Sequence, residues 1–270
     1  MTDLPKDLAG RKALITGGGT GLGRSIALKL AERGADVILN YSRSAGDAEE
    51  AAAEARALGV SAATVQADVA SAEDCAKLAE AAGGSLDILA CNAGITKHAP
   101  KHGDLDALSA DDFLSLYSVN VVGAFLALQA LKPALLAAHE SSGRASAVLM
   151  TSSIAGVTGI GSSVAYAASK GALNTMTLSL ARGLAPAIRV NAVCPGFIGT
   201  RWFKNAMDEE AYAATVARVE ANVPLAAASG PDDIADSAVF LLTDAARHVT
   251  GETLLVDAGA HLNLTPLKAR

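Results

Sequence analysis

A tyrosine and a lysine one helical turn apart are the residues best suited to acid–base chemistry. The stretch AYAASKGA holds Tyr166 and Lys170, and a spacing of four residues puts both side chains on one helix face. A tyrosine has an ordinary pKa of about 10, about 3 units above the value most useful for proton transfer. An ammonium about 4 Å away contributes on the order of 4 kcal/mol at an effective dielectric near 20. Lys170 would therefore lower the pKa of Tyr166, although the spacing alone also fits an ordinary surface pair.

Two serines precede this pair. The apolar run SAVLM (146–150) leads into TSSIAG, which places Ser152 and Ser153 at the carboxyl edge of a parallel sheet, where open α/β sheets bind ligands. A hydroxyl there can hold a substrate carbonyl while Tyr166 protonates it. Taken alone, a serine pair after a strand is more often a helix cap.

A glycine-rich loop follows the first expected strand. ITGGGTGLGRSIA (15–27) reads as a strand, five glycines and an apolar helix. Glycines let the backbone approach a pyrophosphate, and the helix N-terminus supplies free N–H groups. The spacing is TGxxxGxG rather than GxGxxG, and a tight turn without a ligand is the alternative. The residues expected to contact a dinucleotide here are Thr16, Gly17, Gly19, Thr20, Gly21, Leu22 and Gly23.

The end of the second expected strand indicates which dinucleotide. VILNYSRSAG carries no acid before Asp47, whereas NAD-binding sites use an acid near this point to hold the ribose 2′-hydroxyl. A guanidinium with hydroxyls suits a 2′-phosphate, and Arg24 opens the first helix nearby. We therefore expect NADP(H) rather than NAD(H), unless Arg43 is only a solvated turn residue. The expected contacts are Tyr41, Ser42, Arg43 and Ser44.

Strand and helix patterns alternate along the chain. This alternation predicts one α/β domain over 1–270, with a parallel sheet covered by helices on both faces. The expected strands are 13–16, 36–40, 63–67, 86–90, 146–150, 188–193 and 253–257, and the expected helices are 22–33, 45–58, 72–82, 110–139, 163–184, 208–221 and 231–244.

One connection is much longer than the others in this alternating pattern. The stretch of nearly forty residues between the strand near 193 and the helix near 231 holds Phe197, Trp202 and Phe203. A connection this long in a compact domain is often functional. We expect a substrate lid over about 196–224, with a packed structural excursion as the alternative.

Composition excludes several classes of function. The net charge is −6 and no basic run occurs, so we expect neither a nucleic-acid nor a membrane partner. The N-terminus has no signal-peptide pattern, and Cys75, Cys91 and Cys194 form no metal-ligand or disulfide spacing. These features predict a cytoplasmic protein with reduced thiols and no metal site.

The ordered motifs resemble those of the short-chain dehydrogenase/reductase family. Each motif alone is weak, but seven in the right order over about 8–260 are specific. Among its members the chain is similar to 3-oxoacyl-[acyl-carrier-protein] reductases. The motifs are TGGGTGLG (16–23), ADV (67–69), CNAG (91–94), SVN (118–120), TSSIAG (151–156), YAASK (166–170) and VCPGFIGT (193–200).

This resemblance implies a Rossmann fold with a doubly wound seven-stranded parallel sheet, and hydride transfer between a nicotinamide and a ketone or secondary alcohol. It implies that tyrosine is the acid/base, lysine lowers the tyrosine pKa and holds the ribose, serine orients the carbonyl, and asparagine positions a water toward a proton path. Ser153 is chosen over Ser152 because the family serine lies thirteen residues before the tyrosine. The implied catalytic set is Asn120, Ser153, Tyr166 and Lys170.

The resemblance also implies further cofactor and substrate contacts. The cofactor contacts are Asp68 and Val69 near adenine, Asn92, Ala93 and Gly94 near the ribose, and Pro195, Gly196, Ile198 and Thr200 near the nicotinamide, with Tyr166 and Lys170 beside it. The expected substrate pocket comprises His98, Ser153, Ala155, Phe197, Trp202 and Phe203.

Some features depart from the family pattern or are left open by it. Cys91 stands where a second asparagine is usual, and is expected to be a small buried residue. The loop 95–104 borders the active-site mouth in the family, so His98 either binds substrate or is a solvated loop residue. Family tetramers pair the helices near 110–139 and 163–184, and the alanine-rich faces here favour a homotetramer, or a dimer.

Several functions remain open within this resemblance. The substrate is a small carbonyl or alcohol, either a 3-oxoacyl thioester or a cyclic or aromatic ketone or alcohol, the latter with NAD(H) as an option. A non-catalytic dinucleotide sensor on the same fold is a second class, disfavoured by the intact Ser/Tyr/Lys set. Epimerases and dehydratases with the same Tyr-x-x-x-Lys pair usually have longer chains.

Overall fold

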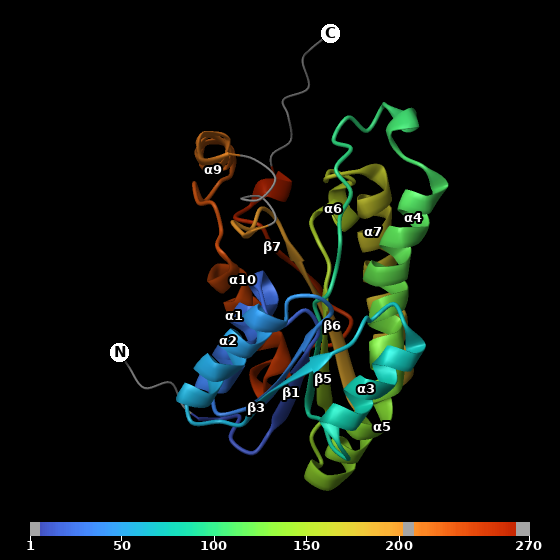
Figure 1. Cartoon of the computed structure of the whole chain (residues 1–270), viewed down its shortest axis with the longest axis vertical. Helices are drawn as coiled ribbons and strands as arrows, with labels where there is room; N and C mark the ends of the chain where they lie inside the picture. The colour runs from blue at the N-terminus through green and yellow to red at the C-terminus, as the bar shows by residue number, and fades with distance from the viewer. Residues whose placement is uncertain (1–5, 202–207, 263–270) are drawn as a thin grey trace.

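The strands form one parallel sheet (Figure 1). The structure, a computed structural model, describes residues 6–201 and 208–262. The order across the sheet is β3-β2-β1-β4-β5-β6-β7. Strands β2 and β3 therefore add to one side of β1 and β4 to β7 add to the other, and the carboxyl ends of β1 and β4 form the switch point where such sheets bind ligands. The strands are β1 (Lys12–Ile15), β2 (Asp36–Tyr41), β3 (Ala62–Gln66), β4 (Ile88–Cys91), β5 (Ser146–Thr151), β6 (Ile188–Pro195) and β7 (Thr253–Val256).

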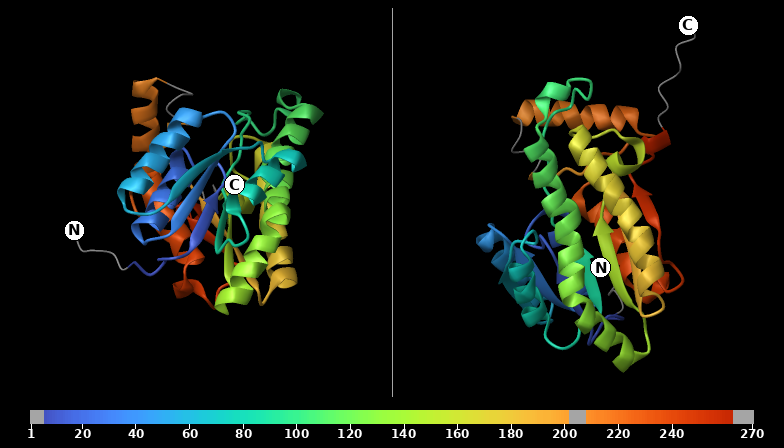
Figure 2. Two further views of the ribbon diagram at one scale, coloured as in Figure 1. Left: turned by 60° about the horizontal axis from the view of Figure 1, so that its bottom comes forward. Right: turned by 90° about the vertical axis from the view of Figure 1, so that its right-hand side faces the viewer.

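Helices cover both faces of this sheet. Helices α1, α2 and α10 pack on one face, and α3, α5 and α7 pack on the other (Figures 1 and 2). The helices are α1 (Gly21–Glu32), α2 (Ala45–Ala57), α3 (Ala72–Ala82), α4 (Ala110–Tyr117), α5 (Ala124–Ser142), α6 (Ala155–Thr158), α7 (Val164–Leu184), α9 (Glu209–Asn222) and α10 (Pro231–Leu242), with shorter turns η1 (Leu105–Ala107), η2 (Ser118–Gly123), η3 (Asp244–Ala246) and η4 (Ala260–Leu262).

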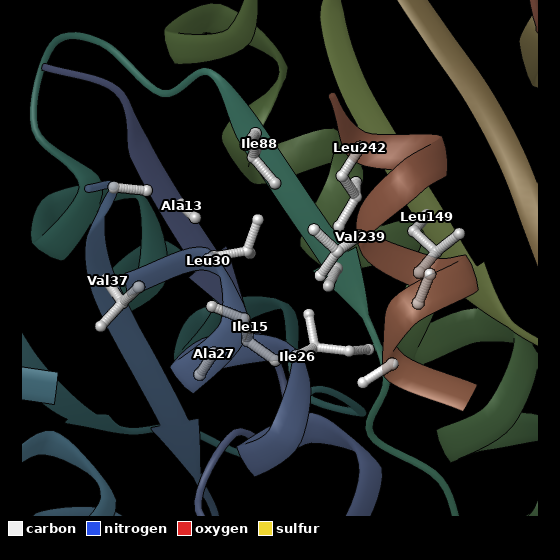
Figure 3. Close-up of a cluster of buried hydrophobic side chains, with 14 of the residues drawn as sticks. Ala13, Ile15, Ile26, Ala27, Leu30, Val37, Ile88, Leu149, Val239 and Leu242 are labelled. Atoms are coloured by element: carbon white, nitrogen blue, oxygen red, sulfur yellow. The ribbon is translucent and has the colours of Figure 1, made fainter. Parts of the chain in front are cut away.

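Two apolar cores follow from the strand alternation. Successive strand residues point to opposite faces, so Ile15 enters the core under α1 and α10 while Leu14 enters the core under α3 and α5. Figure 3 shows Ile26 and Leu30 of α1 gathered with Val239 of α10 against the sheet. These layers fix the carboxyl ends of the strands relative to one another, and so position the loops that follow them.

The predicted fold class is confirmed, and most element bounds agree within two or three residues. The expected helix over 110–139 differs: α4 ends at Tyr117, a π-helical turn η2 follows, and α5 then continues to Ser142. Hydrophobic spacing does not reveal the extra residue of a π-turn, which is a local change often found at functional sites.

Among the described residues, one helical stretch is long and apolar enough to cross a membrane by length and composition. It runs from Ala110 to Ser142, and its most apolar window has a mean hydropathy of 1.8. The same composition suits a core helix of a globular protein, and here α5 packs on α3 and contributes Leu128 and Leu131 to the core.

Candidate active site

Tyr166 lies in the first turn of α7. Ser163 caps this helix, and its hydroxyl accepts a hydrogen bond from the Tyr166 backbone N–H at 3.1 Å. The cap fixes where the helix begins and therefore where the phenol projects. Lys170 follows one turn later, with its Nζ 5.6 Å from the centre of the Tyr166 ring.

The two serines after β5 have different roles. The Ser152 hydroxyl is buried and donates to the Lys170 backbone carbonyl at 3.1 Å. The Ser153 hydroxyl instead accepts from the Ala155 backbone N–H at 3.1 Å, and its hydrogen bonding lowers the pKa of the Tyr166 phenol. Only Ser153 therefore lies where a hydroxyl can share a substrate oxygen with the tyrosine.

Lys170 is almost fully buried, with 4% of its surface exposed. Its Nζ donates to the Thr151 carbonyl at 2.7 Å. Burial lowers the pKa of Lys170 to about 8, because removing an ammonium from water disfavours its charged form.

The expected lowering of the Tyr166 pKa is absent from this structure. Burial raises the pKa of Tyr166 to about 12, and the hydrogen bond with Ser153 opposes this only in part. The Lys170 ammonium lies over the ring and bonds to Thr151 rather than to the phenol. The argument from spacing omitted the cost of burying the phenol, which is the main cause of the raised pKa of Tyr166.

Asn120 is held by the π-helical turn η2. Its Nδ2 donates to the Ile95 carbonyl at 3.0 Å and to the Ser169 hydroxyl at 3.1 Å, and its Oδ1 accepts from the Ile95 N–H at 2.8 Å. A Cβ on Gly94 would lie 3.2 Å from Asn120 Oδ1 and 3.7 Å from Lys170 Nζ. Asn120 Oδ1 and Lys170 Nζ thus both lie close to Gly94, which brings these two members of the predicted catalytic set near each other.

The glycine loop has the close packing that a dinucleotide site needs. A Cβ on Gly23 would lie 2.3 Å from the Gly17 carbonyl oxygen, and Gly17 has a φ of +62°, a left-handed conformation that favours glycine. Thr20 caps α1 without a side-chain hydrogen bond. The N–H groups of the first turn of α1 therefore remain available to an anion, which fits a pyrophosphate.

Some predicted cofactor residues instead support the loop. The Thr16 hydroxyl is buried and accepts from the backbone N–H groups of Asn92 and Ala93 at 2.9 and 3.0 Å. The Asn92 side chain donates to the Thr16 carbonyl at 3.1 Å. Leu22 and Val69 are buried in the interior. The Thr16 and Asn92 side chains position the loop, whereas Gly19, Thr20 and Gly21 lie along it and Asp68 is exposed.

The end of β2 is free of acidic side chains and exposes a cation. Tyr41 is half-buried, and Ser42, Arg43 and Ser44 are exposed. Within residues 6–201 and 208–262, Arg43 has no ion pair. Arg24, in contrast, is paired with Glu54. Arg43 therefore remains the candidate partner for a 2′-phosphate.

The segment after β6 crosses the glycine loop. Thr200 is the nearest neighbour of a Cβ built on Gly21, at 3.3 Å, and a Cβ on Gly196 would lie 2.8 Å from the Asp257 Cβ. Arg201 pairs with Asp47 of α2 at 2.8 Å. Pro195, Gly196 and Ile198 lead into this crossing, so the predicted nicotinamide-side residues lie beside the predicted phosphate loop.

The substrate-pocket predictions have mixed outcomes. Ala155 is buried beside Ser153, and Phe197 lines a cavity of about 440 Å³. His98 is exposed, whereas His102 bonds through its ring to the Gly161 carbonyl at 3.1 Å, next to Tyr166. Trp202 and Phe203 lie outside the described residues.

Sequence reasoning missed most of this cavity wall. The wall includes Ile160, Arg218, Asn222, Ser229 and Ala260. The residues on α9 could have been grouped by their helical spacing, but no pattern in the sequence indicates which face of that helix meets the site. In the part of the chain that the structure describes, no cluster of three His, Cys, Asp or Glu side chains could hold a metal ion.

Known proteins match this chain over most of its length. A family model described as Enoyl-(Acyl carrier protein) reductase matches residues 17–261. The chain is 38% identical to a ketoacyl reductase of the granaticin polyketide synthase from Streptomyces violaceoruber, over 93% of this chain and 96% of that protein. It is 36% identical to an L-rhamnose 1-dehydrogenase (NAD(P)(+)) from Sphingomonas, over 96% and 99%.

A solved structure has the same fold. It is a short-chain dehydrogenase/reductase from Burkholderia xenovorans, 35% identical, with a TM-score of 0.84 over 93% of this chain and 98% of that one. The likeness thus extends through both the glycine loop and the Tyr166 helix.

Proposed function

Because the chain belongs to the short-chain dehydrogenase/reductase family, we propose that it is an NADP(H)-dependent oxidoreductase that interconverts a ketone and a secondary alcohol. The observation that carries this proposal is the convergence of Ser153, Tyr166 and Lys170 at the carboxyl edge of the sheet, beside the glycine loop. A fold alone does not give an activity, whereas this set of side chains has a chemical use.

The cofactor would supply or accept the hydride. The N–H groups at the start of α1 would hold its pyrophosphate, and Arg43 with Ser42 and Ser44 its 2′-phosphate. Of the proposed cofactor contacts, Thr16 and Asn92 act by holding the loop in shape.

Side chains of this protein carry out the proton transfer. In reduction, the Tyr166 phenol donates its proton to the substrate oxygen, and the Ser153 hydroxyl donates a hydrogen bond to the same oxygen. The Lys170 ammonium stabilises the phenolate that this leaves. Asn120, fixed by Ile95 and Ser169, lies with Lys170 beside Gly94 and can position a water toward Lys170.

The substrate is either a 3-oxoacyl thioester or a cyclic or aromatic ketone. The ketoacyl reductase relative favours the first, and the apolar wall formed by Ile160 and Phe197 suits either. The proposed lid, 196–224, includes residues 202–207 outside the described residues, and its α9 part lines this pocket.

We also propose a homotetramer. Phe125 on α5 and Leu178 on α7 are 43% and 51% exposed, and both lie on helices that tetrameric family members pair. Light scattering should give four times the chain mass of 27.1 kDa. A monomeric mass would contradict this assembly.

Turnover resolved by cofactor tests the proposed function. The protein is mixed with NADPH or NADH and a panel of ketones that includes an acetoacetyl thioester, and loss of the reduced-nicotinamide absorbance is followed. We expect turnover with NADPH well above that with NADH. A preference for NADH would contradict the role of Arg43, and tight cofactor binding without turnover of any ketone or alcohol would favour a dinucleotide sensor.

A further inference from the structure

The cavity beside the catalytic side chains has one wall made by α9. Ile160 and Phe197 form the side toward the active site, since the neighbouring Gly161 would place a Cβ 3.5 Å from the Tyr166 ring. On the opposite side, α9 contributes Arg218, Val219 and Asn222, and Val223 follows directly after the helix.

The polar groups in this cavity are few. Asp257 supplies the one carboxylate among its described lining residues. Its oxygens accept from the His261 ring at 2.9 Å and from the backbone N–H groups of Gly259 and His261. Asp257 is therefore bound into the turn after β7, and the Asn222 amide donates to the Arg218 carbonyl at 2.7 Å, which leaves Arg218 and Ser229 to meet a ligand.

Arg218 has no acidic partner within residues 6–201 and 208–262. Side chains three and four residues away on a helix are the ones that pair with it, and here they are alanine, threonine or asparagine. They are Ala214, Thr215, Ala221 and Asn222. Arg218 therefore lines the cavity instead of forming an ion pair along the surface of α9.

The cavity combines this cation with an apolar body. Ligand sites of this kind bind the carbon skeleton with apolar side chains and fix its orientation with a small number of polar groups. An arginine is the side chain best matched to a carboxylate or phosphate, because its planar guanidinium donates two parallel hydrogen bonds.

We propose that Arg218 binds an anionic group of the substrate, so that the preferred substrate is a ketone or alcohol bearing a carboxylate or a phosphate at its far end. This inference rests on the proposed function for the reacting carbonyl, but its site is separate from the catalytic side chains. Asn222, one turn along α9, lines the same cavity, and its Nδ2 donates to the Arg218 backbone carbonyl at 2.7 Å.

Paired substrates test the inference. A medium-chain oxo acid is compared with its methyl ester, and an acetoacetyl thioester of pantetheine 4′-phosphate with that of pantetheine. In the wild-type protein we expect kcat/KM to favour the charged member of at least one pair by about 10–100-fold. Arg218→Gln should remove this preference by raising KM for the charged member, with kcat and the neutral member unchanged.

Two further variants keep this test specific. Arg218→Lys should restore part of the preference because it keeps the charge. Lys132→Gln removes an exposed cation from α5 and should leave the preference intact. The pair that responds identifies the source of the anion, a free acid or a phosphorylated carrier arm. No preference in the wild-type protein, or equal losses for charged and neutral substrates in Arg218→Gln, would overturn the inference.

Binding without turnover separates this inference from the proposed function. Calorimetry with the saturated carboxylic acid that matches the oxo acid needs no reaction. Tighter binding to the wild-type protein than to Arg218→Gln supports the anion site even if no ketone is reduced. Equal binding, or none to either protein, would overturn it.

Discussion

At the residue scale, the site couples two buried ionisable groups that burial shifts in opposite directions. The pKa of Tyr166 is raised to about 12 and that of Lys170 is lowered to about 8. The free protein therefore keeps the phenol protonated, which suits it to donate a proton in ketone reduction. Formation of the phenolate then depends on the charge of Lys170.

Removing the Tyr166 hydroxyl should separate catalysis from binding. Tyr166→Phe is expected to lower kcat for ketone reduction by about 10²–10⁴-fold, the usual contribution of a general acid, with the Kd for NADPH little changed. Tyr117→Phe, on α4, is the matched control and should keep wild-type turnover. Steady-state kinetics and calorimetry measure the two quantities. Persistent turnover in Tyr166→Phe would show that another group supplies the proton.

The pH dependence should report Lys170. Its pKa is lowered to about 8, so the ammonium is present below that pH and lost above it. We expect kcat/KM for reduction, which reports groups of the free enzyme, to be level below about pH 7.5 and to fall roughly tenfold per unit above about pH 8. The Tyr166 phenol, with a pKa near 12, does not titrate in this range. A profile that stays level to about pH 9.5 would contradict a requirement for the ammonium.

At the element scale, the turn between β1 and α1 brings the backbone of the glycine loop close enough to hold a pyrophosphate. Gly23 makes this possible by packing against Gly17 and Asn92. A Cβ at Gly23 would lie 2.3 Å from the Gly17 oxygen and 2.5 Å from Asn92 Nδ2. Neither neighbour can move away freely, because one is backbone and the other is bonded to Thr16.

Gly23→Ala should therefore weaken dinucleotide binding. We expect the Kd for NADPH to rise at least about tenfold, since overpacking of this kind costs roughly 1–3 kcal/mol. Calorimetry measures the Kd, and a urea midpoint shows whether the variant remains folded. Gly84→Ala is the control, because a Cβ there meets nothing within 4 Å. An unchanged Kd in folded Gly23→Ala would mean that the loop does not hold the cofactor.

The sequence was informative where one element determines a residue's position. The alternation of strand and helix patterns predicts helices on both faces of the sheet, and the spacing of Tyr166 and Lys170 predicts their shared helix face. The sequence was not informative where contacts with a second element determine the position or the pKa of a residue. The π-turn that holds Asn120 depends on contacts with Ile95 and Ser169, and burial from several elements reversed the expected direction of the tyrosine pKa.

The cavity wall shows the same limit. The sequence alone indicates that Arg218 is an ordinary charge on an amphipathic helix. Only the structure shows that α9 lies across the cavity from Ile160 and Phe197. The sequence analysis placed His98 in the substrate pocket, whereas the fold directs the ring of His102, in the same loop, to the Gly161 carbonyl. Residues that act across long sequence separations are thus the ones that require the structure.

At the scale of the whole molecule, dinucleotide binding should appear as stability, because a ligand bound only by the folded state raises the free energy of unfolding. At about 100 times its Kd, NADP⁺ should add about 2.7 kcal/mol, or roughly 5–10 °C in Tm for a chain of this size. Arg43→Ala should remove most of the NADP⁺ shift at the same concentration but preserve any shift given by NAD⁺, since NAD⁺ has no 2′-phosphate. Arg182→Ala, an exposed arginine at the far end of α7, should preserve both. Equal shifts with NADP⁺ and NAD⁺, unaffected by Arg43→Ala, would show that the end of β2 does not select the cofactor.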